Sequence, residues 1–151
     1  MSLLASLSDT LNSWRADAEK AIARYNNREF CAAAMSVCAL VAFADGKVDS
    51  SEKQRIAKAI SVNPLLKVFN PDDLRKQFVE ALEKLETDID FGKMELLSVI
   101  AHVKGNEDQS RQLIRIGMII GAADGNFDEK EKAVVADVAK ELKLNPAEFG
   151  L

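Results

Sequence analysis

The feature of the sequence that most constrains its fold is a short acidic turn that occurs twice. The first copy reads ADGKVDSSEK from residue 44 and the second reads ADGNFDEKEK from residue 123, an offset of 79 residues. An apolar segment with helical periodicity precedes each turn, and an amphipathic segment follows it. The sequence therefore predicts an internal duplication of a helix–turn–helix unit.

The rest of the chain also favours helices. Three prolines and seven glycines are few for 151 residues, and Ala, Leu, Glu and Lys are frequent. Apolar residues recur at helical spacing in seven segments. These lie at about residues 7–26, 29–44, 49–61, from Asp72 or Asp73 to about 85, 89–104, 107–123 and 129–142.

We therefore expect an all-α fold, a compact bundle of about seven helices with two helical hairpins related by a pseudo-two-fold axis. Two copies are too few for a solenoid, which needs about three repeats for stability. The expected organisation is one domain over residues 1–151, with an N-terminal helix in residues 1–28 and a duplicated core in residues 29–151.

The charge of the chain limits its partners. A net charge of −4 and a pI near 5.1 argue against nucleic acid, whose phosphates require a concentrated basic face. The first residues lack the basic start of a signal peptide. The longest uncharged run, residues 30–44, is shorter than the roughly 18 residues of a membrane span. We expect a cytoplasmic protein without a transmembrane segment.

The repeated turn has a structural explanation, a helix–turn–helix corner. In each copy the glycine supplies the left-handed residue after a helix, the apolar residue enters the core, and the second aspartate caps the next helix. The glutamate three residues later completes a variant of the capping box. These residues are Gly46, Val48, Asp49 and Glu52 in the first copy and Gly125, Phe127, Asp128 and Glu131 in the second.

The corner does not explain the first aspartate of each copy, Asp45 and Asp124, and this favours a cation site. An acid in the last turn of a helix faces the negative end of the macrodipole, at a cost of about 0.3–1 kcal/mol. Like charges about 4 Å apart add repulsion of about 4 kcal/mol at an effective dielectric of 20. A divalent cation reverses both effects, and oxygen ligands suit calcium first and magnesium second. The candidate metal ligands are Asp45, Asp49, Glu52, Asp124, Asp128 and Glu131.

The predicted cation site differs from an EF-hand. Counted from Asp45 or Asp124, glycine is second and glutamate eighth, whereas an EF-hand loop has glycine at its sixth position and glutamate at its twelfth. Six carboxylates around one divalent ion leave about −4 of uncompensated charge. We therefore expect two neighbouring sites or ligands that act through water. A third interpretation makes Asp49 and Asp128 an acid–base pair, and it requires a pocket between them and a raised carboxyl pKa.

Sulfur and imidazole ligands give weaker indications of function. Cys31, Met35 and Cys38 share a face of one predicted helix, where core packing is favoured over a soft-metal site. The two cysteines are about 10.5 Å apart along the helix axis, beyond the reach of a disulfide. His102 is the only histidine and is expected near the surface, which argues against zinc sites that need several histidines.

The segments ALVAFADGKVDSSEK and GMIIGAADGNFDEKEK, with the apolar helix before each, resemble those of the tellurite-resistance TerB family. The resemblance extends over essentially the whole chain. It implies a helical domain with a duplicated core, an acidic metal-binding cluster and a role in resistance to tellurite and related stresses. It also implies a membrane-embedded partner, TerC, and other Ter proteins, some of which bind calcium.

Together these observations predict a non-enzymatic, cytoplasmic tellurite-resistance or stress-response protein. It would bind calcium, or magnesium or another divalent cation, through its acidic turns, with Asp45 and Asp124 as indispensable ligands. It would dock to TerC and other Ter proteins at the inner face of the inner membrane. The alternative is a scaffold that needs no metal and uses its acidic face to bind a basic protein surface.

Overall fold

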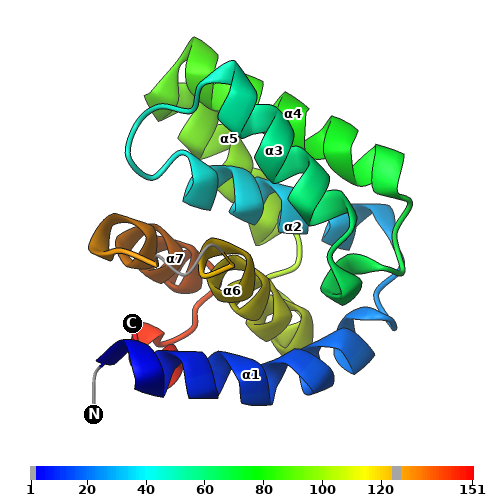
Figure 1. Ribbon diagram of the computed structural model, residues 1–151, viewed down its shortest axis with the longest axis vertical. Helices are drawn as coiled ribbons and strands as arrows, with labels where there is room; N and C mark the ends of the chain where they lie inside the picture. Colours follow the sequence, from blue (N-terminus) through cyan, green and yellow to red (C-terminus); the bar gives the residue numbers. More distant parts are fainter. Residues whose placement is uncertain (1–2, 124–126) are drawn as a thin grey trace.

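Helices form most of the chain in the computed structural model, which describes residues 3–123 and 127–151, with side chains from residue 9 onward (Figure 1). The described residues form seven α-helices and two short 3-10 helices, and contain no strand. In chain order these are α1 (Leu3–Ile22), α2 (Arg28–Ala42), α3 (Ser50–Ser61), η1 (Pro64–Leu66), α4 (Pro71–Thr87), α5 (Ile89–Ala101), α6 (Glu107–Gly121), α7 (Glu129–Glu141) and η2 (Pro146–Phe149). The predicted all-α bundle is confirmed.

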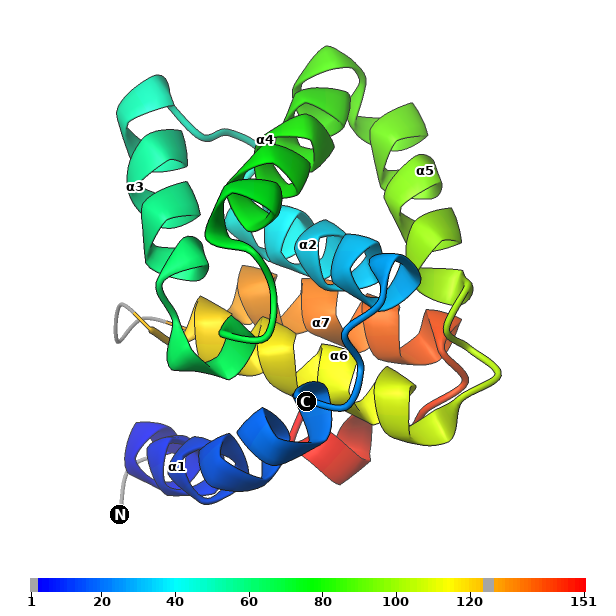
Figure 2. The same ribbon diagram turned by 90° about the vertical axis from the view of Figure 1, so that its right-hand side faces the viewer.

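Helix α2 is the centre of the bundle. It packs against α4 and α5 on one side and against α6 and α7 on the other, so α3, α4 and α5 form an upper layer in Figures 1 and 2 and α6 and α7 lie below. Eleven of its fifteen residues are buried. Neighbours on all sides therefore explain why the uncharged run of residues 30–44 is apolar nearly all round.

Two glycines on α6 allow it to approach α2 closely. A Cβ atom on Gly117 would lie 2.9 Å from Val37 Cγ1, and one on Gly121 would lie 3.0 Å from Val41 Cγ1 and 2.9 Å from the Phe127 ring. Contacts this short do not occur between unstrained atoms. The absence of side chains at these two positions thus sets the spacing of the two central helices.

Helix α1 covers the opposite side of α6 and also contacts η1 (Figure 1). Leu11, Ala18 and Ile22 are buried on its inner stripe, as their spacing predicts. Trp14 meets Phe149 edge-on, with ring centroids 6.1 Å apart, and Arg115 of α6 lies over the Trp14 ring. The single tryptophan therefore joins the first helix to α6 and to the C-terminal turn.

Asn-Pro pairs start three helical segments. Asn63, Asn70 and Asn145 each cap a helix that has proline in its first turn, namely η1, α4 and η2. The sequence predicted a start of the fourth helix at Asp72 or Asp73. The asparagine side chain instead accepts the first free N–H groups, and proline has no N–H to leave unpaired there.

The two hairpins share their order of helices but differ in packing. Helix α7 packs against both α6 and α2. Its counterpart α3 packs against α4 and has no comparable packing against α2 or α6. The predicted pseudo-two-fold relation is therefore approximate, and the first hairpin is the more open one.

Candidate functional site

The first acidic turn is a helix corner of the predicted kind. Helix α2 ends at Ala42, two residues before the predicted end, and Gly46 has the left-handed φ of 89°. Val48 is buried after it, as Phe127 is in the second copy. Asp45 therefore lies in the turn beyond the helix, exposed, with Oδ1 3.4 Å from the Lys47 N–H. The macrodipole penalty that the sequence analysis assigned to Asp45 is correspondingly reduced.

The second aspartate of each turn caps the following helix. Asp49 Oδ1 accepts a hydrogen bond from the Glu52 N–H at 2.8 Å, and Asp128 Oδ1 accepts one from the Glu131 N–H at 2.8 Å. The capping box is complete in the second copy, because Glu131 Oε1 also accepts from the Asp128 N–H at 3.1 Å. The backbone hydrogen bond from Glu52 lowers the pKa of Asp49, and Arg55 acts in the same direction.

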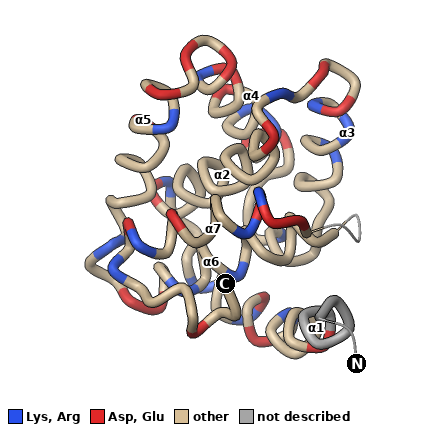
Figure 3. The backbone as a smooth tube through the Cα atoms, turned by 90° about the vertical axis from the view of Figure 1, so that its left-hand side faces the viewer, with Lys and Arg blue, Asp and Glu red and all other residues tan. Residues whose placement is uncertain are grey.

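A pocket of about 470 Å³ brings the two turns together. It lies between α3 and the facing ends of α6 and α7, and residues of α2 line its floor. Four of the six predicted site residues line it: Asp45, Glu52, Asp128 and Glu131. Figure 3 shows the acidic starts of α3 and α7 on the same side of the molecule. Residues 79 positions apart in the sequence thus face one cavity.

The remaining two predicted ligands have different outcomes. Asp49 does not line the pocket, and its Oδ1 is engaged as the cap of α3. Its lowered pKa is the opposite of the raised value that the acid–base interpretation requires. Asp124 lies outside the described residues, as does Gly125.

The carboxylates that line the pocket are spread around it. Within residues 3–123 and 127–151, no three Asp, Glu, His or Cys side chains are close enough to hold one metal ion directly. Asp128 also uses one oxygen to cap α7, which leaves the other for a ligand. This donor set suits a cation that keeps part of its hydration shell better than one enclosed by protein oxygens.

The apolar floor of the pocket was not predictable from the sequence. Cys38, Val41 and Ile60 are buried beneath it, and Ile56 and Ile120 are half-buried at its sides. Hydrophobic periodicity assigns all five side chains to a core, and it carries no signal that two helices separate beside them. Among the described residues that line the pocket, Arg55 is the one basic residue.

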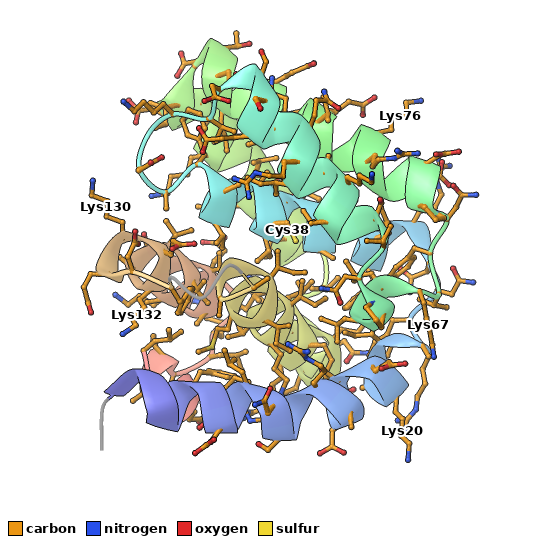
Figure 4. All side chains as sticks on the ribbon, viewed as in Figure 1. Lys20, Cys38, Lys67, Lys76, Lys130 and Lys132 are labelled. Carbon is orange, nitrogen blue, oxygen red and sulfur yellow. The ribbon has the colours of Figure 1, made fainter. Side chains whose placement is uncertain are left out.

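The predicted burial of the cysteines and Met35 and the predicted exposure of His102 are confirmed. Cys31 and Cys38 are free and buried, and Met35 is buried between them. Figure 4 shows Cys38 centrally, where α2 faces α6. Burial raises the pKa of the Cys38 thiol to about 12, so it is neutral at physiological pH. His102 is exposed after the end of α5.

Comparison with known proteins decides the family. The sequence model of the family described as "Tellurite resistance protein TerB" matches residues 31–151. The chain belongs to the TerB family. A protein of Alcaligenes sp. named "Tellurium resistance protein TerB" is 27% identical over 118 residues, which cover 78% of this chain and 97% of that protein. No solved structure matches the chain significantly.

The TerB match begins within α2 and therefore includes both acidic turns and the whole pocket lining. Helix α1 lies outside it. The part of this TerB-family chain that the structure describes has no helix both long and apolar enough to cross a membrane.

Proposed function

We propose that this TerB-family protein is a non-enzymatic tellurite-resistance protein that binds a divalent cation, calcium first, between its two acidic turns. The single observation that carries the proposal is the pocket shared by Asp45, Glu52, Asp128 and Glu131. Like charges that converge on one cavity repel each other, and a cation within it lowers that repulsion.

The proposed cation keeps some of its water ligands. The carboxylates of the described residues are too dispersed to enclose an ion, so water molecules would bridge part of the distance to them. Calcium tolerates irregular coordination by six to eight oxygens, and magnesium usually keeps several waters. Asp124, by its position in the repeat, is the proposed additional ligand.

Cation binding would serve to regulate docking to other proteins of the tellurite-resistance system, including a TerC-like membrane protein. The support for this step is the family and the acidic character of the pocket rim. An ion there would change the charge that a partner meets without changing the fold. Association with the membrane would then be peripheral and would depend on the partner.

A calcium titration followed by amide chemical shifts and by calorimetry tests the cation site. Binding should shift amides around Gly46 and at the starts of α3 and α7. Asp45→Asn combined with Asp124→Asn should weaken calcium binding about tenfold or more, a loss of about 1.4 kcal/mol per factor of ten. Magnesium, titrated in the same way, would establish the preference between the two ions.

The matched control is Asp9→Asn combined with Asp17→Asn, which removes the same charge from exposed positions on α1. This control should bind calcium as the wild type does. Equal affinity in all three proteins, or small uniform shifts that potassium chloride reproduces, would refute the cation site.

The second candidate function needs no metal: the acidic rim binds a basic protein surface directly. The dispersed arrangement of the carboxylates favours this alternative. High salt should then weaken the complex with a Ter partner, because the Debye length falls from about 8 Å at 0.15 M to about 3 Å at 1 M. Addition of a chelator should leave this complex unchanged. If calcium regulates docking, the chelator should instead either dissociate or strengthen the complex.

A further inference from the structure

The pocket exists because the duplicated hairpins pack differently. In the second hairpin α7 lies against α6 and α2, which covers the apolar side chains at that corner. In the first, α3 leans onto α4, and its Lys53 Nζ is held 2.6 Å from Glu86 Oε1. Side chains of α2, α3 and α6 that would be covered in a symmetric bundle therefore line an open groove.

The floor and sides of this groove are apolar. Ile56 and Ile120 lie at its sides, half-buried, and Val41 lies beneath them. Ala42 and Ala59 are small residues that widen the space between the helices. The volume of about 470 Å³ falls within the range of about 300–1,000 Å³ typical of ligand pockets. It has room for one or two large aliphatic or aromatic side chains.

The rim of the groove is acidic. Four carboxylates line it against one guanidinium, Arg55. They come from both hairpins, so they would flank an apolar group inserted between the helices on more than one side. A hydrated ion alone makes no use of the apolar floor, and an uncharged apolar ligand makes no use of the rim. A single segment that combines an apolar side chain with neighbouring basic residues uses both.

We propose that the groove between α3 and the facing ends of α6 and α7 docks a short amphipathic, basic segment of a partner protein. One or two apolar side chains enter between Ile56 and Ile120, and flanking Lys or Arg side chains meet the four carboxylates. This is the helix-in-groove mode of recognition, with charge complementarity setting the partner and its orientation. The inference rests on the proposed function in one respect, that the acidic turns serve partner docking.

Three synthetic peptides of about four helical turns test the proposal. The first has leucines on one helical face and lysines on the other, the second replaces the lysines with glutamates, and the third replaces the leucines with serines. In the presence of EDTA the Leu/Lys peptide should bind, and the other two should bind at least about tenfold more weakly. Amide shifts should concentrate at residues 42–45, 56–60 and 120–123.

Variants of the groove separate it from general electrostatic attraction. Ala59→Gln places a longer, uncharged side chain at an exposed alanine that lines the groove, and it should weaken binding of the Leu/Lys peptide about tenfold. Ala133→Gln makes the same change at an exposed position of α7 outside the groove, and binding should not change. Glu52→Gln should weaken binding of the Leu/Lys peptide. Glu83→Gln, at an exposed position of α4 outside the groove, should not.

Two results would overturn the proposal. The first is absence of binding by the Leu/Lys peptide, and the second is equal binding by the Ser/Lys peptide with shifts spread over the acidic surface. The peptide titration, repeated with calcium, distinguishes failure of the docking proposal from failure of the cation site. If calcium weakens peptide binding more than potassium chloride of equal ionic strength, both proposals gain support. If calcium has no such effect while the Leu/Lys peptide binds in EDTA, the groove stands and the cation site fails.

Discussion

Gly121 is the residue that most directly controls the spacing of the helices at the groove. A methyl group at this position would lie 2.9 Å from the Phe127 ring and 3.0 Å from Val41. Both neighbours are buried, so neither can move without disturbing the core. The lack of a side chain at Gly121 therefore lets Phe127, in the second acidic turn, pack close to the C-terminal end of α2.

We predict that Gly121→Ala lowers the free energy of unfolding by about 1–3 kcal/mol, the usual cost of overpacking a core. The control is Gly105→Ala, where a Cβ atom meets nothing within 4 Å. Its free energy of unfolding should change little or increase slightly, because alanine restricts the unfolded chain. Urea denaturation followed by circular dichroism measures both. A Gly121→Ala protein as stable as the wild type would contradict the packing described for α2 and α6.

Asp49 gives a prediction for the pH dependence of stability. Its hydrogen bonds lower its folded pKa below the ordinary value of 3.8. The carboxylate therefore adds stability that is fully present above pH 3.8 and is lost as the pH falls through the lower folded value. Asp49→Asn keeps an N-cap side chain but cannot titrate.

The wild type should therefore lose more stability than Asp49→Asn when the pH is lowered from 5 to below 3.8, as measured by urea denaturation at each pH. Asp17→Asn, at an exposed position of α1, is the control and should follow the wild type. Parallel curves for wild type and Asp49→Asn would show that the cap contributes no pH dependence.

At the scale of single elements, α1 depends on Trp14 for its attachment to the bundle. The indole contacts Phe149 of η2 and the Arg115 guanidinium of α6, 5.6 Å from the ring centroid. Trp14→Ala should lower the free energy of unfolding by about 1–3 kcal/mol, less than the about 3–5 kcal/mol of a fully buried aromatic residue, because Trp14 is only partly buried.

Circular dichroism is the suitable measurement for Trp14→Ala, because the change removes the only tryptophan and its fluorescence. Ser13→Ala, an exposed neighbour on the same helix, is the control and should stay within about 0.5 kcal/mol of the wild type. An unchanged midpoint for Trp14→Ala would mean that α1 adds no stability to the bundle.

The sequence predicts helices well and their relative positions poorly. Periodicity locates all seven α-helices within a few residues, and the turn chemistry of Gly46, Asp49 and Asp128 is confirmed in detail. These are local properties, set by spacing and by hydrogen bonds within four residues. The prediction that the two turns lie close together rested on the inferred duplication and not on a local pattern. The direction in which α3 leans depends on long-range packing that no local pattern records.

At the scale of the whole molecule, the arrangement around α2 predicts cooperative unfolding. Helix α2 contacts four other helices, so neither hairpin can separate without exposing its apolar surface. Loss of helicity by circular dichroism and the change in Trp14 fluorescence should have the same urea midpoint. Separate midpoints would show that α1 or one hairpin unfolds independently.

The buried Cys38 thiol offers an independent probe of the same transition. Burial raises its pKa to about 12, so at pH 8 it is both neutral and inaccessible. In a Cys31→Ser protein, Cys38 beneath the groove should react with a thiol reagent much more slowly under native conditions than in denaturant. Rapid reaction of Cys38 under native conditions would contradict its placement between α2 and α6.

The ion pair between Lys53 and Glu86 connects α3 to the far end of α4, and this has a mechanical consequence. One wall of the groove is formed by α2 and α6, which pack closely at Gly117 and Gly121. The other wall is α3, which packs on α4 rather than on α2 or α6. A displacement of α4 would therefore move α3 and change the width of the groove at its mouth. The helix on which this width depends carries none of the six predicted metal ligands.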